Sequence, residues 1–175
     1  MANAIIVVDM QNGFMRPDGT LYCGDQAREI IPRIVARVQG ERDAGAALFF
    51  TQDSHVKNDK EFEMFPPHCI EGSEEEQLID ELAPLAEDAH IIKKRRYSAF
   101  FETELAGALD ELWPDKVVVM GDCTDICVLH TVSGLRNRDY AVEVPADCVA
   151  SFDSEQHHWA LGHMEKILGA RITNR

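Results

Sequence analysis

The sequence has no long hydrophobic run and little positive charge. No apolar stretch in the 175 residues approaches the roughly 20 residues of a transmembrane helix. Lys and Arg number 17 against 31 Asp and Glu, which gives a formal net charge of −14. Nucleic acids and anionic membranes bind basic surfaces, so this balance argues against either as a partner. The one basic cluster, at 93–96, is short and adjoins an apolar motif.

The cysteines do not follow a disulfide or zinc-ribbon pattern. Cys23, Cys69, Cys123, Cys127 and Cys148 are an odd number, and no basic region precedes the first apolar run as it would in a secretory signal. We therefore expect reduced thiols and a cytoplasmic location. Cys123 and Cys127 lack zinc-ribbon spacing, and no second cysteine pair is present to complete such a site.

Phosphate-binding glycine motifs are also missing. No GxGxxG follows the first apolar run and there is no P-loop, which argues against a dinucleotide or triphosphate ligand. The sequence shows no internal repeat, low-complexity tract or linker. Its length and its 45% hydrophobic content are typical of one globular domain, which we place at residues 1–175.

Six apolar runs of strand length alternate with segments of helical periodicity. Strands are predicted at 4–8, 47–51, 90–93, 117–120, 141–144 and 170–173, and helices at 31–38, 74–85, 103–112, 129–135 and 154–167. Thr103 and Ser154 are the expected caps of two of these helices. The alternation predicts an α/β fold, with an open parallel sheet and helices on both faces. Such sheets bind ligands outside the carboxyl ends of their strands.

Three reactive side chains follow three different predicted strands. Cys127 lies near the start of a predicted helix, where backbone amides and the helix dipole favour a thiolate or a developing oxyanion. Asp9 can take the thiol proton, and the Lys94 ammonium would favour the charged forms of both groups. Taken singly, each residue has a structural alternative: a buried cysteine, a strand-end or cap residue, a solvated lysine. Together at one sheet edge they favour a nucleophilic site.

The long connection after the second strand carries possible metal ligands. Asp53-x-His55 and His68 offer one carboxylate and two imidazoles, which are common ligands of a zinc-like divalent ion. Glu61 and Glu63 lie between them and could add an oxygen. The alternative is that both histidines are simply solvated. A connection of this length is usually functional or disordered, and the stiff segment 65–69 argues against disorder.

Aromatic side chains in the predicted loops could enclose a flat ring. Phe14, Phe65 and Tyr97 lie at the functional edge of the sheet. For Phe100 and Trp113 a place in the core is the stronger interpretation.

These residues resemble the isochorismatase-like cysteine hydrolases, and within them the nicotinamidases. The resemblance runs through the whole chain. It is carried by Ile-Val-Val-Asp9-Met-Gln-Asn-Gly-Phe14, Asp53-Ser-His55, Phe65-Pro-Pro-His68, Lys94-x-x-Tyr97-Ser-Ala-Phe100 and Gly121-x-x-Thr124-Asp125-x-Cys127. The Pro-Pro-His segment is the most diagnostic of nicotinamidases.

The resemblance implies a three-layer α/β/α fold with a six-stranded parallel sheet in the order 3-2-1-4-5-6. It also implies a catalytic triad of Asp9, Lys94 and Cys127. Asp53, His55 and His68 would hold one divalent ion, with zinc as the first expectation and iron or manganese as alternatives. Glu61 stands at the position of the fourth ligand in some members, seven residues before His68.

The implied oxyanion hole consists of the backbone amides of Cys123 and Cys127, with a cis peptide bond between Asp122 and Cys123. Members commonly carry two small or apolar residues at that bond, and this chain departs from the pattern with Asp122 and Cys123. The implied activity is hydrolysis of nicotinamide to nicotinic acid and ammonia through a Cys127 thioester, as part of NAD salvage, with Phe14, Phe65 and Tyr97 flanking the ring. Family members commonly form homo-oligomers. Two alternatives remain: a cysteine hydrolase acting on a carbamoyl, ureido or other small amide, and a non-enzymatic binder of a small ligand.

Overall fold

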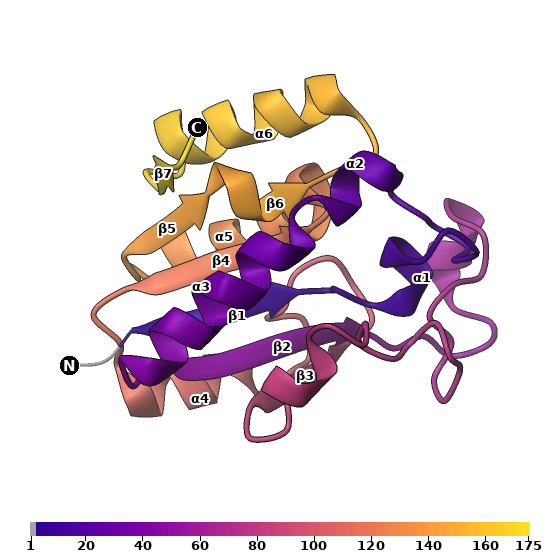
Figure 1. The fold of residues 1–175 in the computed structure, drawn as a ribbon, viewed down its shortest axis with the longest axis horizontal. Helices are drawn as coiled ribbons and strands as arrows, with labels where there is room; N and C mark the ends of the chain where they lie inside the picture. The colour runs from indigo at the N-terminus through magenta and orange to yellow at the C-terminus, as the bar shows by residue number, and fades with distance from the viewer. Residues whose placement is uncertain (1–2) are drawn as a thin grey trace.

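A seven-stranded parallel sheet forms the centre of the computed structural model, which describes residues 3–175 (Figure 1). Six strands run in the order β3-β2-β1-β4-β5-β7, and β6 pairs with β4 off this path. This confirms the α/β fold and the expected order of six strands. The strands are β1 Ala4–Val8, β2 Ala47–Asp53, β3 His90–Lys94, β4 Val117–Asp122, β5 Val142–Pro145, β6 Val149–Ala150 and β7 Arg171–Thr173.

The additional strand β6 was not predicted. After β5, a 3-10 turn at Ala146–Cys148 carries the chain outward, and two residues then return to the sheet beside β4. Val149 pairs with Gly121 and Ala150 with Asp122, whereas β5 pairs with the start of β4. A two-residue strand is too short to show the periodicity from which strands are predicted.

Helices cover both faces of the sheet. They are α1 Asn12–Met15, α2 Asp25–Arg28, α3 Ile31–Asp43, α4 Leu105–Leu112, α5 Leu129–Arg136 and α6 Ser154–Lys166. In Figure 1, α3 crosses in front of the sheet, while α4 and α5 lie behind it. Two further 3-10 turns occur at Lys60–Glu63 and Ala83–Leu85.

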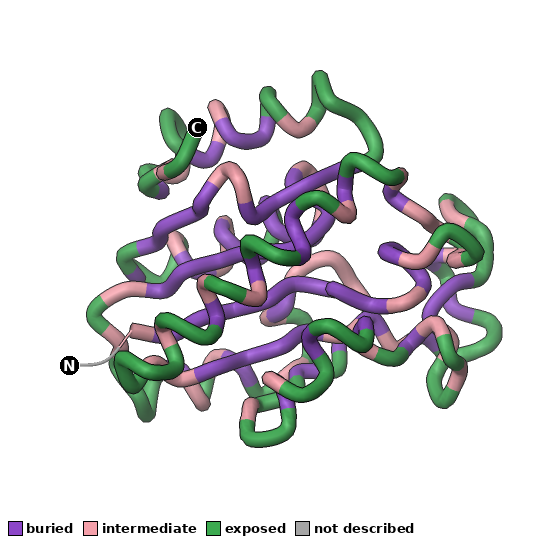
Figure 2. Tube along the Cα trace, viewed as in Figure 1, coloured by how far each residue is buried: buried purple, intermediate pink, exposed green. Residues whose placement is uncertain are grey.

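Alternation along β1 divides the core between the two faces. Ile5 and Val7 pack with the buried residues of α2 and α3, whereas Ile6 and Val8 pack with those of α4, α5 and α6. Every residue of β1 is fully buried, as its unbroken apolar sequence predicts for a strand covered on both faces. Figure 2 shows this burial along the central strands, with exposed residues on the outer sides of the helices.

The helix predicted at 74–85 is wrong. The segment consists of turns, with a 3-10 turn only at its end. Its acidic side chains accept hydrogen bonds from loop amides: Glu75 Oε1 from Thr20 N at 2.7 Å, and Glu76 Oε2 from Gly72 N at 2.7 Å. These contacts, together with the burial of Ile79 and Leu82, hold the segment in a form that helical periodicity does not describe.

Three smaller predictions also need correction. The short helix α1 lies in the segment after the first strand, where no helix is predicted and Phe14 is placed in a loop. The cap of α6 is Asp153, whose carboxylate accepts the amides of Glu155 at 2.7 Å and Gln156 at 3.0 Å, and Ser154 is the first helical residue. Trp113 is 66% exposed rather than in the core, because it ends α4 in a left-handed conformation with φ of 43°. Within residues 3–175, no helix is both long and apolar enough to cross a membrane.

Candidate active site

The carboxyl ends of four parallel strands bring the candidate residues together. Asp9 follows β1, Asp53 ends β2 and Lys94 ends β3. The register pairs Asp53 with Lys94 across β2 and β3, and Val8 with Gly121 across β1 and β4. Residues from distant parts of the sequence therefore meet at one edge of the sheet, as the positions of the predicted strands indicate.

Lys94 is the centre of the first cluster. Its Nζ lies 2.7 Å from Asp9 Oδ2 and 3.6 Å from Cys127 Sγ, and it also hydrogen-bonds Asp53 Oδ1. All four side chains are buried. Thr51 Oγ1 donates to Asp9 Oδ1 at 2.5 Å and accepts the Asp9 amide at 3.1 Å, which fixes the orientation of that carboxylate. Asp9 itself has a left-handed φ of 51°, a strained conformation typical of functional positions.

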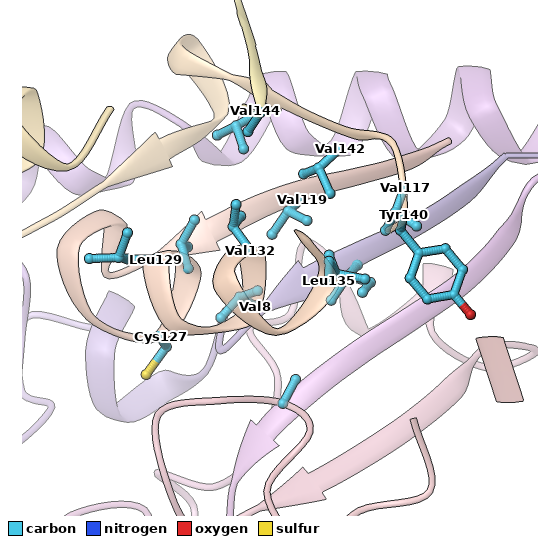
Figure 3. Close-up of a cluster of buried hydrophobic side chains, with 14 of the residues drawn as sticks. Val8, Val117, Val119, Cys127, Leu129, Val132, Leu135, Tyr140, Val142 and Val144 are labelled. Atoms are coloured by element: carbon cyan, nitrogen blue, oxygen red, sulfur yellow. The ribbon is translucent and has the colours of Figure 1, made fainter. Parts of the chain in front are cut away.

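The segment carrying Cys127 begins with a π-helical turn at Thr124–Val128, not with a regular α-helix. The carbonyl of Cys123 accepts the amides of Ile126 and Val128, each at 3.1 Å, and this folds the turn back on itself. The peptide bond between Asp122 and Cys123 is cis, as the resemblance implies. Figure 3 shows Cys127 at the margin of the core cluster, with its sulfur directed away from Leu129 and Val132.

Gly121 lets β4 approach β1 closely just before this turn. Its φ is +116°, and a Cβ at this position would lie 2.1 Å from the carbonyl oxygen of Val8. No residue with a side chain fits there without moving the backbone that carries Asp9. The close contact therefore sets the separation between the Asp9 and Cys127 segments.

Burial and Lys94 have opposite effects on the pKa values of Asp9 and Cys127. Burial raises the pKa of Asp9 and outweighs the lowering effect of Lys94. Burial likewise raises the pKa of the Cys127 thiol well above its ordinary value, although Lys94 acts in the opposite direction. Lys94 keeps its proton because the Asp53 and Asp9 carboxylates outweigh burial and raise its pKa. The thiol therefore becomes nucleophilic only when a neighbouring base removes its proton.

Four buried residues form a second cluster with the composition of a metal site. One ligand atom from each of Asp53, His55, Glu61 and His68 lies within 4.8 Å of all the others. Asp53 Oδ2 is 3.7 Å from His55 Nε2 and 3.8 Å from His68 Nε2. Glu63, the other acid considered between the histidines, is exposed.

Orphaned polar atoms show that this cluster fits a cation. Among the described residues, Glu61 Oε2 and His55 Nε2 are buried without a hydrogen-bond partner. His68 Nδ1 lies 2.9 Å from the carbonyl oxygen of Pro66, which leaves Nε2 free to bind an ion. Two imidazoles and two carboxylates suit zinc, iron or manganese. Asp53 belongs to both clusters: its Oδ1 bonds Lys94, and its Oδ2 faces the histidines.

A pocket connects the two clusters, and the three aromatic residues singled out from the sequence line it. Phe14, Phe65 and Tyr97 share its wall with Asp9, Cys127 and three of the metal-site residues, Asp53, Glu61 and His68. The Phe14 and Phe65 rings lie 5.7 Å and 6.3 Å from the His68 ring, each with its edge toward the other ring. The pocket thus offers apolar faces beside a nucleophile, an arrangement suited to a flat ring carrying a reactive substituent.

Sequence reasoning missed several residues of the site. Leu21, Ile126 and Phe152 also line the pocket, and Phe152 was out of reach because it follows the unpredicted strand β6. Asp59 and Arg96 stand behind the metal cluster, 2.7 Å apart. The signal available for Asp59 was its position four residues after His55, at the start of the 3-10 turn.

The fold is that of the isochorismatase family. The isochorismatase domain model matches residues 3–175, and the chain belongs to this family. A relative from Bacillus subtilis (strain 168), named uncharacterized isochorismatase family protein PncA, is 36% identical over 181 residues, 98% of this chain and 99% of its own. The crystal structure of nicotinamidase/pyrazinamidase PncA from Bacillus subtilis has a TM-score of 0.93 at 37% identity, covering 99% of this chain and 100% of that one.

Two further similarities bear on the metal and on activity. The pyrazinamidase of Pyrococcus horikoshii, crystallised in complex with zinc, has a TM-score of 0.90 at 29% identity and covers 100% of both chains. An Arabidopsis thaliana relative named probable inactive nicotinamidase is 30% identical, over 94% of this chain and 88% of its own. The chain is therefore a hydrolase of this family, and its substrate and mechanism depend on its own residues.

Proposed function

We propose that this protein hydrolyses nicotinamide to nicotinic acid and ammonia through a thioester on Cys127. The observation that carries the proposal is the buried contact of Lys94 Nζ with both Asp9 Oδ2 and Cys127 Sγ. A base, a cation and a thiol in one cluster form an activated nucleophile. The similarity to the Bacillus subtilis nicotinamidase supports the choice of amide.

In the first stage Asp9 takes the proton of Cys127, and the thiolate attacks the carboxamide carbon. The raised pKa of Asp9, caused by burial, makes it a stronger base than a solvated aspartate. Lys94 stabilises the thiolate at the moment it forms. The backbone amides of Cys123 and Cys127 donate hydrogen bonds to the oxyanion of the tetrahedral intermediate and stabilise its charge. Asp9 then returns its proton to the nitrogen, the C–N bond breaks, and ammonia leaves.

In the second stage water hydrolyses the thioester. Asp9, now a carboxylate again, removes a proton from the water as it attacks the thioester carbon. The C–S bond breaks, nicotinic acid is released, and Cys127 recovers its proton. Each stage uses the same base and the same oxyanion amides, so one constellation serves both halves of the reaction.

The metal cluster and the aromatic wall would orient the substrate. Asp53, His55, Glu61 and His68 are the residues that would hold the divalent ion, which when bound supplies a Lewis acid for a ring nitrogen or an ordered water. Phe14, Phe65 and Tyr97 would flank the ring and hold it beside Cys127.

Ammonia release from nicotinamide tests the proposal. We expect steady release by the purified protein, and a loss of kcat by a factor of at least about 10³ in Cys127→Ala. Mass spectrometry after rapid acid quenching should show the acyl adduct on Cys127. A protein that hydrolyses other small amides but leaves nicotinamide intact would refute the substrate assignment.

The principal alternative is a hydrolase of the same fold that acts on a carbamoyl or ureido compound. The metal cluster favours the nicotinamidase proposal, because the hydrolases of that alternative class usually lack a metal. Metal analysis of the purified protein separates the two: a metal-free protein that cleaves ureido substrates would favour the alternative. A non-enzymatic ligand binder is disfavoured by the intact contact of Asp9, Lys94 and Cys127. A Cys127 inert toward a mild alkylating agent would revive it.

The cellular context stays a prediction. A role in NAD salvage follows from the proposed reaction, because its product is a precursor of the pyridine nucleotides. A cytoplasmic location, assembly as a homo-oligomer, and no nucleic-acid or membrane partner are the remaining expectations from the sequence.

A further inference from the structure

His55 has a buried carboxylate behind it. Its Nδ1 lies 3.3 Å from Asp59 Oδ2, on the side of the ring opposite the Nε2 that faces Asp53. Among the described residues, neither His55 Nδ1 nor Asp59 Oδ2 has a hydrogen-bond partner. Two buried polar atoms of complementary type therefore face each other.

The other oxygen of Asp59 is held in place. Asp59 Oδ1 accepts a hydrogen bond from Arg96 at 2.7 Å and from the Glu61 amide at 2.9 Å. Arg96 comes two residues after Lys94, just beyond the end of β3. The connection that carries the metal-site residues is thereby tied to the strand that supplies the lysine of the triad.

A metal-bound imidazole needs its second nitrogen fixed. A carboxylate on that nitrogen sets the tautomer and the ring orientation and makes the binding nitrogen more basic. Without it, the ring can rotate, and the imidazole proton can move to the nitrogen that should bind the ion. The arrangement of Arg96, Asp59 and His55 provides such a support before any ion arrives.

We propose that Asp59 and Arg96 are positioning residues of the metal site: Asp59 orients His55 so that Nε2 faces the ion, and Arg96 holds Asp59 in that place. The inference rests on the metal cluster of the proposed function, but not on the substrate. Asp59 also serves as the N-cap of the 3-10 turn at Lys60–Glu63, so a loss of capping must be separated from a loss of histidine support.

The variants Asp59→Asn and Arg96→Ala make this separation. Asparagine keeps an oxygen that can cap the turn but loses the carboxylate charge facing His55. The matched controls are Asp153→Asn, which changes the aspartate that caps α6, and Arg95→Ala, which removes the neighbouring arginine paired with Glu102 on the surface. Neither control residue contacts the metal cluster.

The measurement is the Zn²⁺ affinity of the stripped protein, determined by competition with a chromophoric chelator. We expect Asp59→Asn and Arg96→Ala to weaken binding by about 10- to 100-fold, and both controls to stay within about twofold. Arg96→Lys should recover part of the loss, because it restores a cation beside Asp59. The melting temperature of each metal-free variant is measured in parallel, since a purely structural role would lower it without a selective loss of affinity.

The outcomes are distinct. If both variants bind Zn²⁺ as tightly as the unmodified protein, the positioning role is refuted while the metal site stands. If the unmodified protein binds no Zn²⁺, the metal site of the proposed function fails, and this inference with it. If binding follows the expected pattern but nicotinamide is not hydrolysed, the inference stands and only the substrate assignment fails.

Discussion

Replacing Lys94 with methionine would remove a cation that contacts two buried carboxylates, those of Asp9 and Asp53. Asp9 and Lys94 are each within 2% of full burial, and Asp53 is 3% exposed. Asp53 would keep the histidines that face its Oδ2, but Asp9 would keep neutral partners, the Thr51 hydroxyl and the Cys127 thiol. Asp9 is therefore the group that the substitution leaves uncompensated.

Breaking a buried ion pair by removing one partner costs about 3–5 kcal/mol. For a domain of this size each kcal/mol lowers Tm by roughly 2–4 °C, so the expected decrease is about 6–20 °C. The matched control is Arg16→Met, which removes a surface arginine that pairs with Asp18 and Glu74, with side chains that are 41%, 74% and 76% exposed, respectively. Exposed pairs contribute at most about 1 kcal/mol, so this variant should melt within about 4 °C of the unmodified protein.

Thermal unfolding followed by circular dichroism, with a chelator present to remove bound metal, measures both variants. The cost should also depend on pH. Without the ammonium, burial raises the folded-state pKa of Asp9 further above its unfolded value, so the folded state binds more protons and loses stability as pH rises through that pKa. The destabilisation relative to the unmodified protein should therefore be smaller at pH 5 than at pH 8. A Lys94→Met protein no less stable than Arg16→Met would refute the reasoning.

Three further predictions concern the backbone, a helix cap and the metal. Gly121→Ala should lower the free energy of unfolding by at least about 3 kcal/mol, because its Cβ would overlap the backbone of Val8. Gly162→Ala is the control: a Cβ there meets nothing within 4 Å, so the change should be neutral or stabilise by up to about 1 kcal/mol. Urea unfolding compares the two variants. Asp153→Ala should cost about 1 kcal/mol by the same assay, and an unchanged midpoint would contradict its capping role. Zn²⁺ affinity should fall from pH 7.5 to pH 5.5, because burial and Asp53 raise the pKa of Glu61 and its proton competes with the ion; equal affinities would contradict Glu61 as a ligand.

The features predicted well from the sequence were those with a strong local signal. The run 4–8 is apolar at every position, and only a strand covered on both faces tolerates that pattern. Once the strands were placed, the parallel order put Asp9, Lys94 and the Cys127 turn at one edge, and the structure brings them together there. The family resemblance added Glu61 and the cis bond, which residue types and spacing alone left open.

The features that were missed depend on how the folded chain places side chains and backbone, and local sequence patterns do not show this. The segment 74–85 has helical spacing, but Glu75 accepts a hydrogen bond from the amide of Thr20, which is distant in sequence, and Glu76 accepts one from the nearby amide of Gly72. These hydrogen bonds override the local helical preference. Asp59 resembles any loop acid until the fold places it behind His55. Strand β6 forms because the end of β4, which β5 leaves unpaired, can pair with it.

The two oxygens of Asp53 point to different neighbours, Oδ1 to the ammonium of the triad and Oδ2 to the imidazoles. The carboxylate carries a single negative charge, so a cation that binds Oδ2 weakens the interaction of Oδ1 with the Lys94 ammonium. The coupling is reciprocal. If binding of the ion changes the proton affinity of the nucleophile, then protonation of the nucleophile changes the affinity for the ion by the same free energy. The protonation state of the nucleophile and the occupancy of the metal site are therefore thermodynamically linked.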